Sequence, residues 1–325
     1  MSASHDKSDH GHGHADHGDS DGHHHGHSHG LGHSHAPADF GRAFAIGVTL
    51  NAAFVLIEIV FGLFAHSLAL VADAGHNFGD VIGLLLAWTA SSLAKKSPTA
   101  RYTYGLRRTS ILAAFLNALI LLVSMGGLGW EAVRRFNAAT PVAANIVIWV
   151  SLIGILINST TAAMFMAGRK HDLNIRAAFL HMAGDALISA GVVAAGFVIR
   201  STHWLWLDPA VSLVIVVLIL WSTWGLFRDS LQLTLDAVPA GIDANAVRTF
   251  LKSLPGVVDA HDLHIWGLST TETALTAHLV LESNALDGEL LQHIHHELED
   301  DFNIQHVTIQ LEPRGSRPCV TSRCD

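Results

Sequence analysis

Six long apolar stretches occupy the chain between residues 42 and 230, and each is long enough to cross a bilayer as a helix. The hydrocarbon core of a bilayer is about 30 Å thick, which an α-helix spans with about 20 residues. The pattern therefore predicts six transmembrane helices, over residues 44–65, 68–93, 110–133, 142–167, 176–199 and 207–227.

The pattern changes after about residue 240, where polar positions recur and the apolar runs shorten to the length of strands. We expect a helix, two strands, a helix and a strand, over residues 244–254, 258–268, 273–282, 288–302 and 306–312. This order predicts a small α+β sandwich in which two helices cover one face of the sheet.

The chain thus divides into four predicted parts. They are a His-rich tail (1–41), a six-helix transmembrane domain (42–230), a soluble domain (231–313) and a C-terminal tail (314–325). The first tail is nearly free of aliphatic residues, so it cannot build a core and we predict that it is disordered.

Basic residues set the predicted orientation, because loops rich in Lys and Arg stay on the cytoplasmic side. Among the loops that connect the spans, the loops after the second and fourth spans carry most of the Lys and Arg residues, namely Lys95, Lys96, Arg101, Arg107, Arg108, Arg169 and Lys170. Both termini and the soluble domain are therefore predicted to be cytoplasmic, with the spans in the plasma (inner) membrane.

The composition supports a membrane protein. The 325 residues are 50% hydrophobic and 14% charged, against about a quarter charged in an average soluble protein. A net charge of −9 provides no basic surface, which excludes nucleic acid as a partner. The two cysteines, Cys319 and Cys324, lie within the last seven residues, so no disulfide framework holds the fold.

Histidine is unusually frequent, and 12 of the 24 histidines precede residue 36. Neutral imidazole is a common ligand of zinc, nickel and copper, so this tail is a candidate metal reservoir. The alternative is a solubilising tail of low complexity.

Two spans carry the same ionisable string, H-x-x-G-D. His76 and Asp80 lie in the second span, and His181 and Asp185 lie in the fifth. A spacing of four residues places each pair on one helix face, and ionisable residues within a span mark a functional site by default. We expect Gly79 and Gly184, one residue before each aspartate, to let helices approach closely.

If the two faces meet, two imidazoles and two carboxylates form a shell of the kind that tetrahedral zinc takes. Two aspartates and one divalent cation sum to zero charge, which suits a site surrounded by hydrocarbon. Protons compete with metal for the same groups, so a site that opens to each side in turn would be an antiporter. The competing interpretation is that each side chain bonds locally within a packed bundle.

Three further polar residues lie in the first two spans. Asp73 either orients a metal ligand without binding the ion itself or caps a helix distortion, and we favour the first role. Glu58 and Asn51 are either proton-path residues or a packed polar seam.

The chain resembles the cation diffusion facilitator family, specifically its bacterial zinc exporters, over nearly all of residues 42–313. The motifs that carry the resemblance run from Ser67 to Asp80, from Tyr104 to Arg107, from His181 to Asp185, from Asp208 to Ala210 and from His261 to Trp266. The resemblance implies a homodimer of six-span protomers with a cytoplasmic ferredoxin-like domain and proton-coupled export of divalent metal. It makes His76, Asp80, His181 and Asp185 the transport site, and His at the first position resembles the zinc-preferring members.

Two loops depart from relatives. The loop at residues 168–175 holds only His171, whereas many eukaryotic members have a His-rich loop there, for which the N-terminal tail is a candidate substitute. Some bacterial members carry an extra metal site in the loop after the second span. Residues 95–108 contain no His, Asp, Glu or Cys here, so we predict that this site is absent.

Relatives also bind zinc in the soluble domain, where we favour His261 and His278 as ligands; ordinary surface histidines are the alternative. His261 and His264 differ in strand parity, so a straight strand cannot turn both to one side. The later ligand of some relatives aligns with Gln305, which leaves His306 one residue out of place. We interpret His293, His295 and His296 as a solvated helix face.

The leading hypothesis is a zinc/proton antiporter with no permanently bound cofactor. Its expected partners are Zn2+, protons, the lipid bilayer and a second copy of the chain. The alternatives are a broader exporter of cadmium, cobalt or nickel, and a membrane-anchored zinc buffer or sensor that does not transport. An enzyme is disfavoured, because a metal hydrolase keeps an open coordination position that four protein ligands do not leave.

Overall fold

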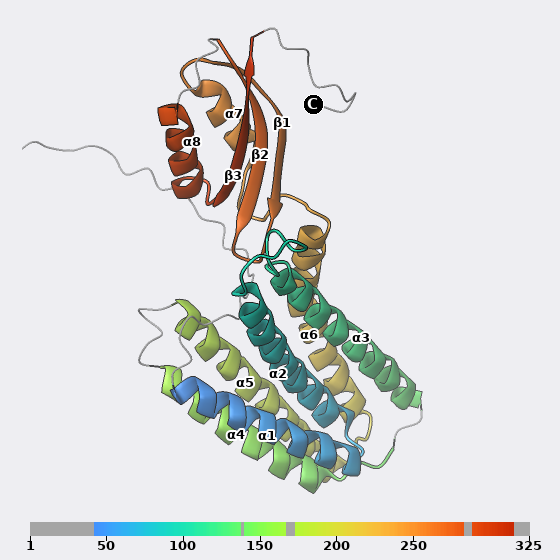
Figure 1. Cartoon of the computed structure of the whole chain (residues 1–325). Coiled ribbons are helices and arrows are strands. Elements are labelled where there is room, and N and C mark those ends of the chain that lie inside the picture. Colours follow the sequence, from blue (N-terminus) through green and yellow to red (C-terminus); the bar gives the residue numbers. More distant parts are fainter. Residues whose placement is uncertain (1–41, 138–139, 167–172, 283–287, 315–325) are drawn as a thin grey trace, which may run out of the picture. The chain divides into compact units, whose positions relative to one another are not determined.

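The computed structural model describes residues 42–137, 140–166, 173–282 and 288–314 (Figure 1). Its elements, in order, are α1 (Arg42–Phe64), α2 (Leu68–Ala94), α3 (Thr109–Asn137), α4 (Ala144–Phe165), α5 (Leu173–Thr202), α6 (Leu207–Thr234), α7 (Ala244–Ser253), β1 (Val257–Gly267), β2 (Thr273–Leu281), α8 (Gly288–Asp300) and β3 (His306–Pro313). The predicted order of elements is confirmed. The sixth helix is longer than predicted, because the backbone stays helical through Thr234 after the apolar run ends at Phe227.

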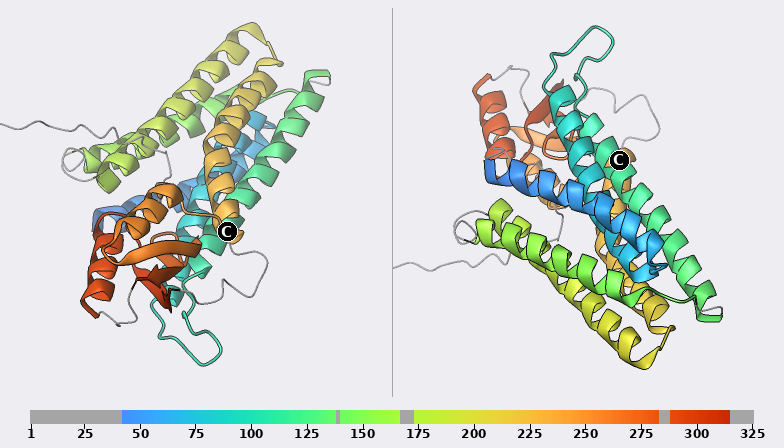
Figure 2. Two further views of the ribbon diagram at one scale, coloured as in Figure 1. Left: turned by 90° about the horizontal axis from the view of Figure 1, so that it is seen from above. Right: turned by 90° about the horizontal axis from the view of Figure 1, so that it is seen from below.

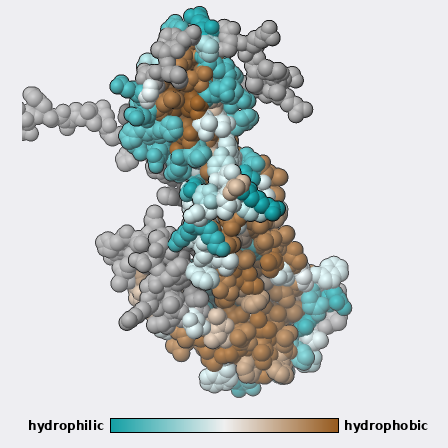
Figure 3. All heavy atoms as spheres, in the orientation of Figure 1, coloured by the Kyte–Doolittle hydropathy of each residue, from teal (hydrophilic) through white to brown (hydrophobic). Residues whose placement is uncertain are grey.

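The helices from α1 to α6 present a largely apolar outer surface (Figure 3). Among the described residues, four helical stretches are long and apolar enough to cross a membrane, at Thr109–Phe136, Ala144–Phe165, Arg176–Thr202 and Leu207–Thr234. The described apolar part of α1 is shorter, at Thr49–Phe64, and the apolar sequence of the continuous helix α2 is interrupted by Asp73, His76 and Asp80. The count of six spans therefore stays a prediction.

The helices pack in neighbouring pairs, with α4 along α5, α3 along α6, and α1 along α2 (Figure 2). Small buried side chains such as Ala65, Ala69 and Ala72 lie at these contacts. Small residues let helix backbones approach closely, which increases van der Waals contact where lipid removes the hydrophobic driving force.

Gly154 of α4 marks a close approach of α4 to both α1 and α5. A Cβ atom added there would lie 2.8 Å from Cζ of Phe54 on α1 and 3.2 Å from Oγ of Ser189 on α5. We expect Gly154→Ala to destabilise the folded protein by about 1–3 kcal/mol, the usual cost of overpacking. Thermal unfolding of the detergent-solubilised protein measures this loss.

The matched control is Gly191→Ala on α5, where an added Cβ would meet nothing within 4 Å. Alanine is favoured over glycine within a helix by about 1 kcal/mol, so this variant should be as stable as the native chain or more stable. Equal stability of the two variants would contradict the close approach at Gly154.

The N-terminus of α2 is fixed by a side chain from α6. Asp208 is 2% exposed, and its carboxylate accepts hydrogen bonds from the Ser67 hydroxyl, from the Leu68 amide at 2.8 Å and from the Ala69 amide at 3.4 Å. Helix N-termini carry unsatisfied amides that favour an anion. One buried carboxylate therefore joins the start of α2 to the start of α6.

The soluble domain is a three-stranded sheet with β2 in the centre, antiparallel to β1 and parallel to β3. Alternate residues of β2 are buried, and Leu275, Ala277 and Leu279 pack under α7 and α8, which cover the same face of the sheet (Figure 1). The helices contribute Val247, Leu251, Ile294 and Leu298 to this core. The opposite face of the sheet therefore carries the intervening residues of β2, which include His278.

Candidate metal sites

The structure brings the two H-x-x-G-D strings together. His76 and Asp80 project from one face of α2, and His181 and Asp185 from one face of α5. The expected close approach at the glycines holds at Gly79 only, where an added Cβ would lie 2.7 Å from Leu121 of α3. At Gly184 an added Cβ would meet nothing within 4 Å, because the Cβ direction there faces open space.

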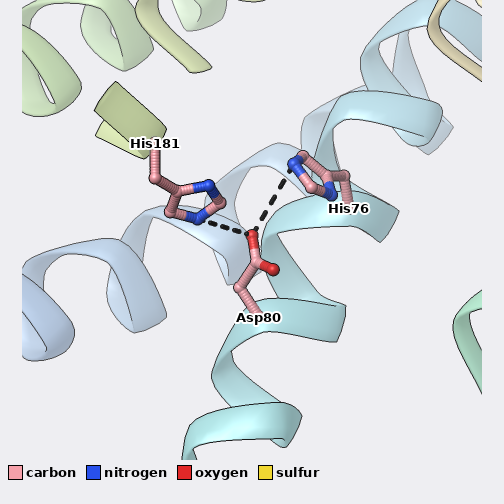
Figure 4. A group of neighbouring side chains, drawn as sticks. All are labelled: His76, Asp80 and His181. Atoms are coloured by element: carbon pink, nitrogen blue, oxygen red, sulfur yellow. Dashed lines mark ion pairs between the residues drawn. The ribbon is translucent and has the colours of Figure 1, made fainter. Parts of the chain in front are cut away.

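In this tetrad, the carboxylate of Asp80 lies between the rings of His76 and His181 (Figure 4), and Asp185 places a second carboxylate near each ring. Nε2 of His76 is 3.7 Å from Oδ2 of Asp80 and 3.5 Å from Oδ1 of Asp185. Nε2 of His181 is 3.2 Å from Oδ2 of Asp80 and 3.7 Å from Oδ2 of Asp185. The ligand atoms of His76, Asp80 and His181 lie within 4.8 Å of one another, so a single ion could contact all three.

The tetrad is unevenly exposed. The side chain of Asp185 is 3% exposed and that of His76 is 13%, whereas Asp80 and His181 are 28% and 29% exposed. A buried carboxylate needs a compensating positive charge. The side chains present could hold this charge in two forms, a divalent cation that contacts His76, Asp80 and His181, or protons on the imidazoles.

Asp73, Glu58 and Asn51 lie among the same helices. Ser189 of α5 donates a hydrogen bond of 3.0 Å to Oδ2 of Asp73, and Asn77 of α2 donates one of 3.1 Å to Oε2 of Glu58. Nδ2 of Asn51 lies 3.7 Å from the sulfur of Met182. Ser189 and Asn77 were not among the residues predicted from the sequence, although Ser189 follows Asp185 by one helical turn and so shares its face.

A second group of possible ligands lies on the face of the sheet opposite α7 and α8. His261 of β1 and His278 of β2 are register partners, so their side chains point to the same face, with ring centroids 5.3 Å apart. Glu312 of β3 joins them diagonally, with Oε1 at 2.9 Å from Nδ1 of His278 and Oε2 at 3.6 Å from Nε2 of His261. The three side chains are between 14% and 20% exposed.

The sequence left the third ligand of this group open, because the position used by some relatives falls at Gln305 and His306 is one residue out of place; in the structure Glu312 joins the two histidines. Gln305 lies before β3, where its side-chain oxygen accepts a hydrogen bond from the amide of Thr273, and His306 forms an edge contact with the ring of Tyr104. The parallel pairing of β3 with β2 sets His278 opposite Gln310. Glu312, two residues further, therefore faces the same side.

His264 lies apart from this group along β1, although the shift in register pairs it with Thr276 and so places it on the same face of the sheet as His261 and His278, unlike the expectation for a straight strand. The register shifts between His261 and His264, where Asp262 has a φ of 50°. His264 is 65% exposed and lies 3.1 Å from Asp262. Oδ2 of Asp262 lies 3.6 Å from Nε2 of His278, so this bulge places a further carboxylate at the edge of the group.

Within the described ranges, the remaining histidines do not extend either group. His293 and His296 on α8 lie 3.9 Å and 3.3 Å from carboxylate oxygens four residues later, and both are more than half exposed. The His-rich tail, His171, Cys319 and Cys324 lie outside the described residues.

Comparison with known proteins divides the chain between two families. Residues 44–233 match the family described as cation efflux transmembrane domain, and residues 239–314 match the family described as cation efflux protein, cytoplasmic domain. Together the two matches cover most of the chain.

Several curated proteins align with this chain over most of its length. The zinc transporter ZitB of Escherichia coli is 36% identical over 283 residues, 86% of this chain and 88% of the relative. The metal cation efflux system protein CzcD of Cupriavidus metallidurans is 35% identical over 277 residues, 85% and 88% of the two chains. A Bacillus subtilis protein named cadmium, cobalt and zinc/H(+)-K(+) antiporter is 34% identical over 276 residues, 83% and 88%.

One solved structure is similar in sequence to part of this chain, the metal-bound C-terminal domain of the CzcD transporter from Cuprividus metallidurans. It is 40% identical and covers 22% of this chain and 99% of that chain, with a TM-score of 0.20.

Proposed function

The chain belongs to the cation efflux family, the cation diffusion facilitators, and from this premise we propose that it exports zinc from the cytoplasm in exchange for protons. This is a family of metal transporters and not of enzymes. Beyond family membership, the proposal names the metal ion that is transported, the protons that are exchanged for it and the residues that bind both.

The meeting of His76, Asp80, His181 and Asp185 between α2 and α5 is the observation that carries the proposal. Two imidazole nitrogens and two carboxylate oxygens are a donor set that tetrahedral zinc accepts. With zinc bound and both histidines neutral, the net charge of the group is zero, which offsets much of the cost of burying Asp185.

Exchange follows from the chemistry of the same four groups. A zinc ligand must be deprotonated, so zinc and protons compete for the tetrad. Each histidine nitrogen already lies within 3.2–3.7 Å of two carboxylates, so protons on the imidazoles would neutralise the carboxylates once zinc leaves. A tetrad that opens alternately to the two sides of the membrane would then move zinc one way and protons the other.

The names of two relatives support the choice of ions. The Escherichia coli relative is named a zinc transporter, and the name of the Bacillus subtilis relative includes cadmium, cobalt, zinc and exchanged protons. We propose zinc as the main substrate. Because a set of two nitrogens and two oxygens does not exclude other divalent ions by affinity alone, cadmium and cobalt are the second candidates.

The proposal includes an orientation and an assembly. Residues 42–230 cross the plasma membrane six times, residues 231–313 form a cytoplasmic domain, and both termini face the cytoplasm, as the basic loops at residues 95–108 and 169–170 favour. The functional unit is a homodimer, in keeping with the match of residues 239–314 to the cytoplasmic domain of the family.

Zinc flux into proteoliposomes under an imposed pH gradient, with protons followed in parallel, tests the function directly. We expect zinc movement that depends on the gradient and an opposite movement of protons. Saturable zinc binding without flux in the correctly inserted protein would instead favour a buffer or sensor. Equal flux of zinc, cadmium and cobalt would favour the broader exporter.

We further propose that His261, His278 and Glu312 bind a regulatory zinc ion in the cytoplasmic domain. The three side chains supply two nitrogens and a carboxylate within 4.8 Å of one another, and a tetrahedral ion would keep one position for water or Asp262. Nδ1 of His278 and Nε2 of His261 both face the carboxylate of Glu312, at 2.9 Å and 3.6 Å, so two nitrogens and a carboxylate converge where one ion could bind.

Glu312→Ala should weaken zinc binding at this cytoplasmic group by tenfold or more. Partners that merely orient a ligand already contribute about 10- to 100-fold to metal affinity, and Glu312 would be a ligand itself. Zinc titration against a competing chelator measures the effect, in a background that lacks residues 1–36 and carries Asp80→Ala. His264→Ala is the control, because that side chain is 65% exposed and lies outside the group; an equal loss in both variants would contradict the assignment.

A further inference from the structure

Two buried carboxyl groups, distinct from the tetrad, meet between α1 and α2. Glu58 and Asp73 are both 0% exposed, and their side chains lie within hydrogen-bonding reach of each other. Asn77 donates to Oε2 of Glu58 at 3.1 Å, and Ser189 donates to Oδ2 of Asp73 at 3.0 Å. Each carboxyl group therefore has one oxygen satisfied by a neutral donor.

The second oxygen of each group is buried without a hydrogen-bond partner, at Oε1 of Glu58 and Oδ1 of Asp73. An ionised carboxylate can only accept hydrogen bonds, so two carboxylates cannot satisfy each other. A single proton converts one of them into a donor. Two carboxyl groups that cannot both be ionised at short range share a proton for this reason.

The groups that act most strongly on the pair in the described part of the chain include no Lys or Arg, and their one basic member, His76, belongs to the tetrad. The other ionisable groups that influence the pair are His76 on α2 and Asp185 on α5. Helix α4, which packs against α1 and α5, contributes no ionisable residue between Ala144 and Phe165. An added proton is therefore the simplest way to reduce the negative charge of the pair.

The buried face of α4 near the pair is nonetheless polar. Gly154 lies against Ser189, and one turn on either side of it Ser151 and Asn158 are both 0% exposed. The hydroxyl of Ser151 and both amide atoms of Asn158 have no hydrogen-bond partner. Buried polar atoms of this kind are ordinarily satisfied by water, so this region of the bundle has the character of a proton path.

The pair lies between the tetrad and one end of the bundle. Asp73 precedes His76 by one turn on α2, and Ser189 follows Asp185 by one turn on the antiparallel α5. At about 1.5 Å per residue, Glu58 lies about 9 Å from the end of α1 and Asp73 about 8 Å from the start of α2. A proton that enters at this end would reach Glu58 and Asp73 before the tetrad.

We propose that Glu58 and Asp73 share one proton and form a relay that delivers protons to the tetrad from the end of the bundle where α1 ends and α2 begins. When zinc leaves the tetrad, the O–H bond of the pair breaks, and a new O–H or N–H bond forms at a tetrad residue. The pair then takes a replacement proton from water at that end. This inference rests on the proposed proton exchange, whereas the shared proton itself does not depend on transport.

Infrared spectroscopy of the full-length protein in lipid tests the shared proton. At neutral pH we expect the carbonyl band of a protonated, buried carboxylic acid, which Glu58→Gln and Asp73→Asn should each remove or shift. Glu299→Gln, an exposed change on α8, should leave the band unaltered. A band that is absent from the native protein, or unaffected by both substitutions in the pair, would overturn the proposal.

Proteoliposome flux tests the relay. Proton transfer through a positioned side chain accelerates a step by about 10²–10⁴-fold, so we expect Glu58→Gln to slow proton-coupled zinc flux by about 10- to 100-fold. Glutamine has nearly the same shape and its amide can donate to Asp73, so zinc binding at the tetrad should be retained, which verifies folding. Asp73→Asn is the second variant, and Glu299→Gln should transport at the native rate.

Native rates of coupled flux in both Glu58→Gln and Asp73→Asn would overturn the relay while leaving the antiport intact. Absence of coupled flux in the unmodified protein would overturn the proposed antiport and the relay with it, and the infrared band would still decide whether the proton is shared. The two failures are therefore distinguishable.

Discussion

Zinc flux is expected to fall below detection when either aspartate of the tetrad is replaced with alanine. Asp80→Ala or Asp185→Ala leaves a bound divalent cation with one compensating carboxylate instead of two. Removing one partner of a buried charge pair costs about 3–5 kcal/mol, which is roughly a 100- to 3,000-fold loss of zinc affinity. Flux into proteoliposomes and zinc titration of the same preparations measure the two effects.

Two further substitutions separate charge from packing. Asp80→Asn keeps the size of the side chain and removes its charge, so it should lose flux as completely as Asp80→Ala. Asp229→Ala removes an exposed carboxylate from α6 and should transport normally. Substantial flux in Asp185→Ala would place the exchange site elsewhere.

The second large effect is expected at Asp208, which joins α6 to the start of α2. Asp208→Ala leaves the Ser67 hydroxyl and the amides of Leu68 and Ala69 without their acceptor. Each buried donor left unsatisfied costs about 1–3 kcal/mol, and partial relaxation of the helix end should bring the total loss of stability to about 3 kcal/mol. Hydrogen exchange at Leu68 and Ala69, together with thermal unfolding in detergent, checks this result.

Asp243→Ala is the matched control for a helix cap. Asp243 is exposed and accepts a hydrogen bond of 2.8 Å from the Asn245 amide at the start of α7, so its loss should cost only about 0.5–2 kcal/mol. Asp208→Asn, which retains one acceptor oxygen, should fall between the two. Unchanged exchange at Leu68 in Asp208→Ala would show that the carboxylate does not hold α2.

The group formed by His261, His278 and Glu312 could be predicted from the sequence only in part, because the pairing of the strands was not known. His261 and His278 could be selected because their residue type and position fit a metal site. Glu312 could not be placed with them, because its position depends on the parallel pairing of β3 with the central strand β2. Spacing along one strand gives the face of each residue but not the register between strands.

The buried carboxyl pair shows the same limit among helices. The sequence marks Glu58 and Asp73 as ionisable residues within apolar segments, and it leaves open whether each is functional. Their contact arises because α1 and α2 pack along each other. A helical period of 3.6 residues fixes which residues share a face, but not which faces of two helices meet.

By itself the sequence determined the order of the helices and strands, the repeated His and Asp pairs and the family to which the chain belongs. These features depend on composition and on spacing within one element, where backbone geometry relates sequence position directly to direction. Only the tertiary structure decided that Asp208 caps α2, that Glu312 joins His261 and His278, and that Glu58 lies against Asp73. Each of those contacts joins residues from different elements, and it exists because burial and hydrogen bonding between packed surfaces select one arrangement.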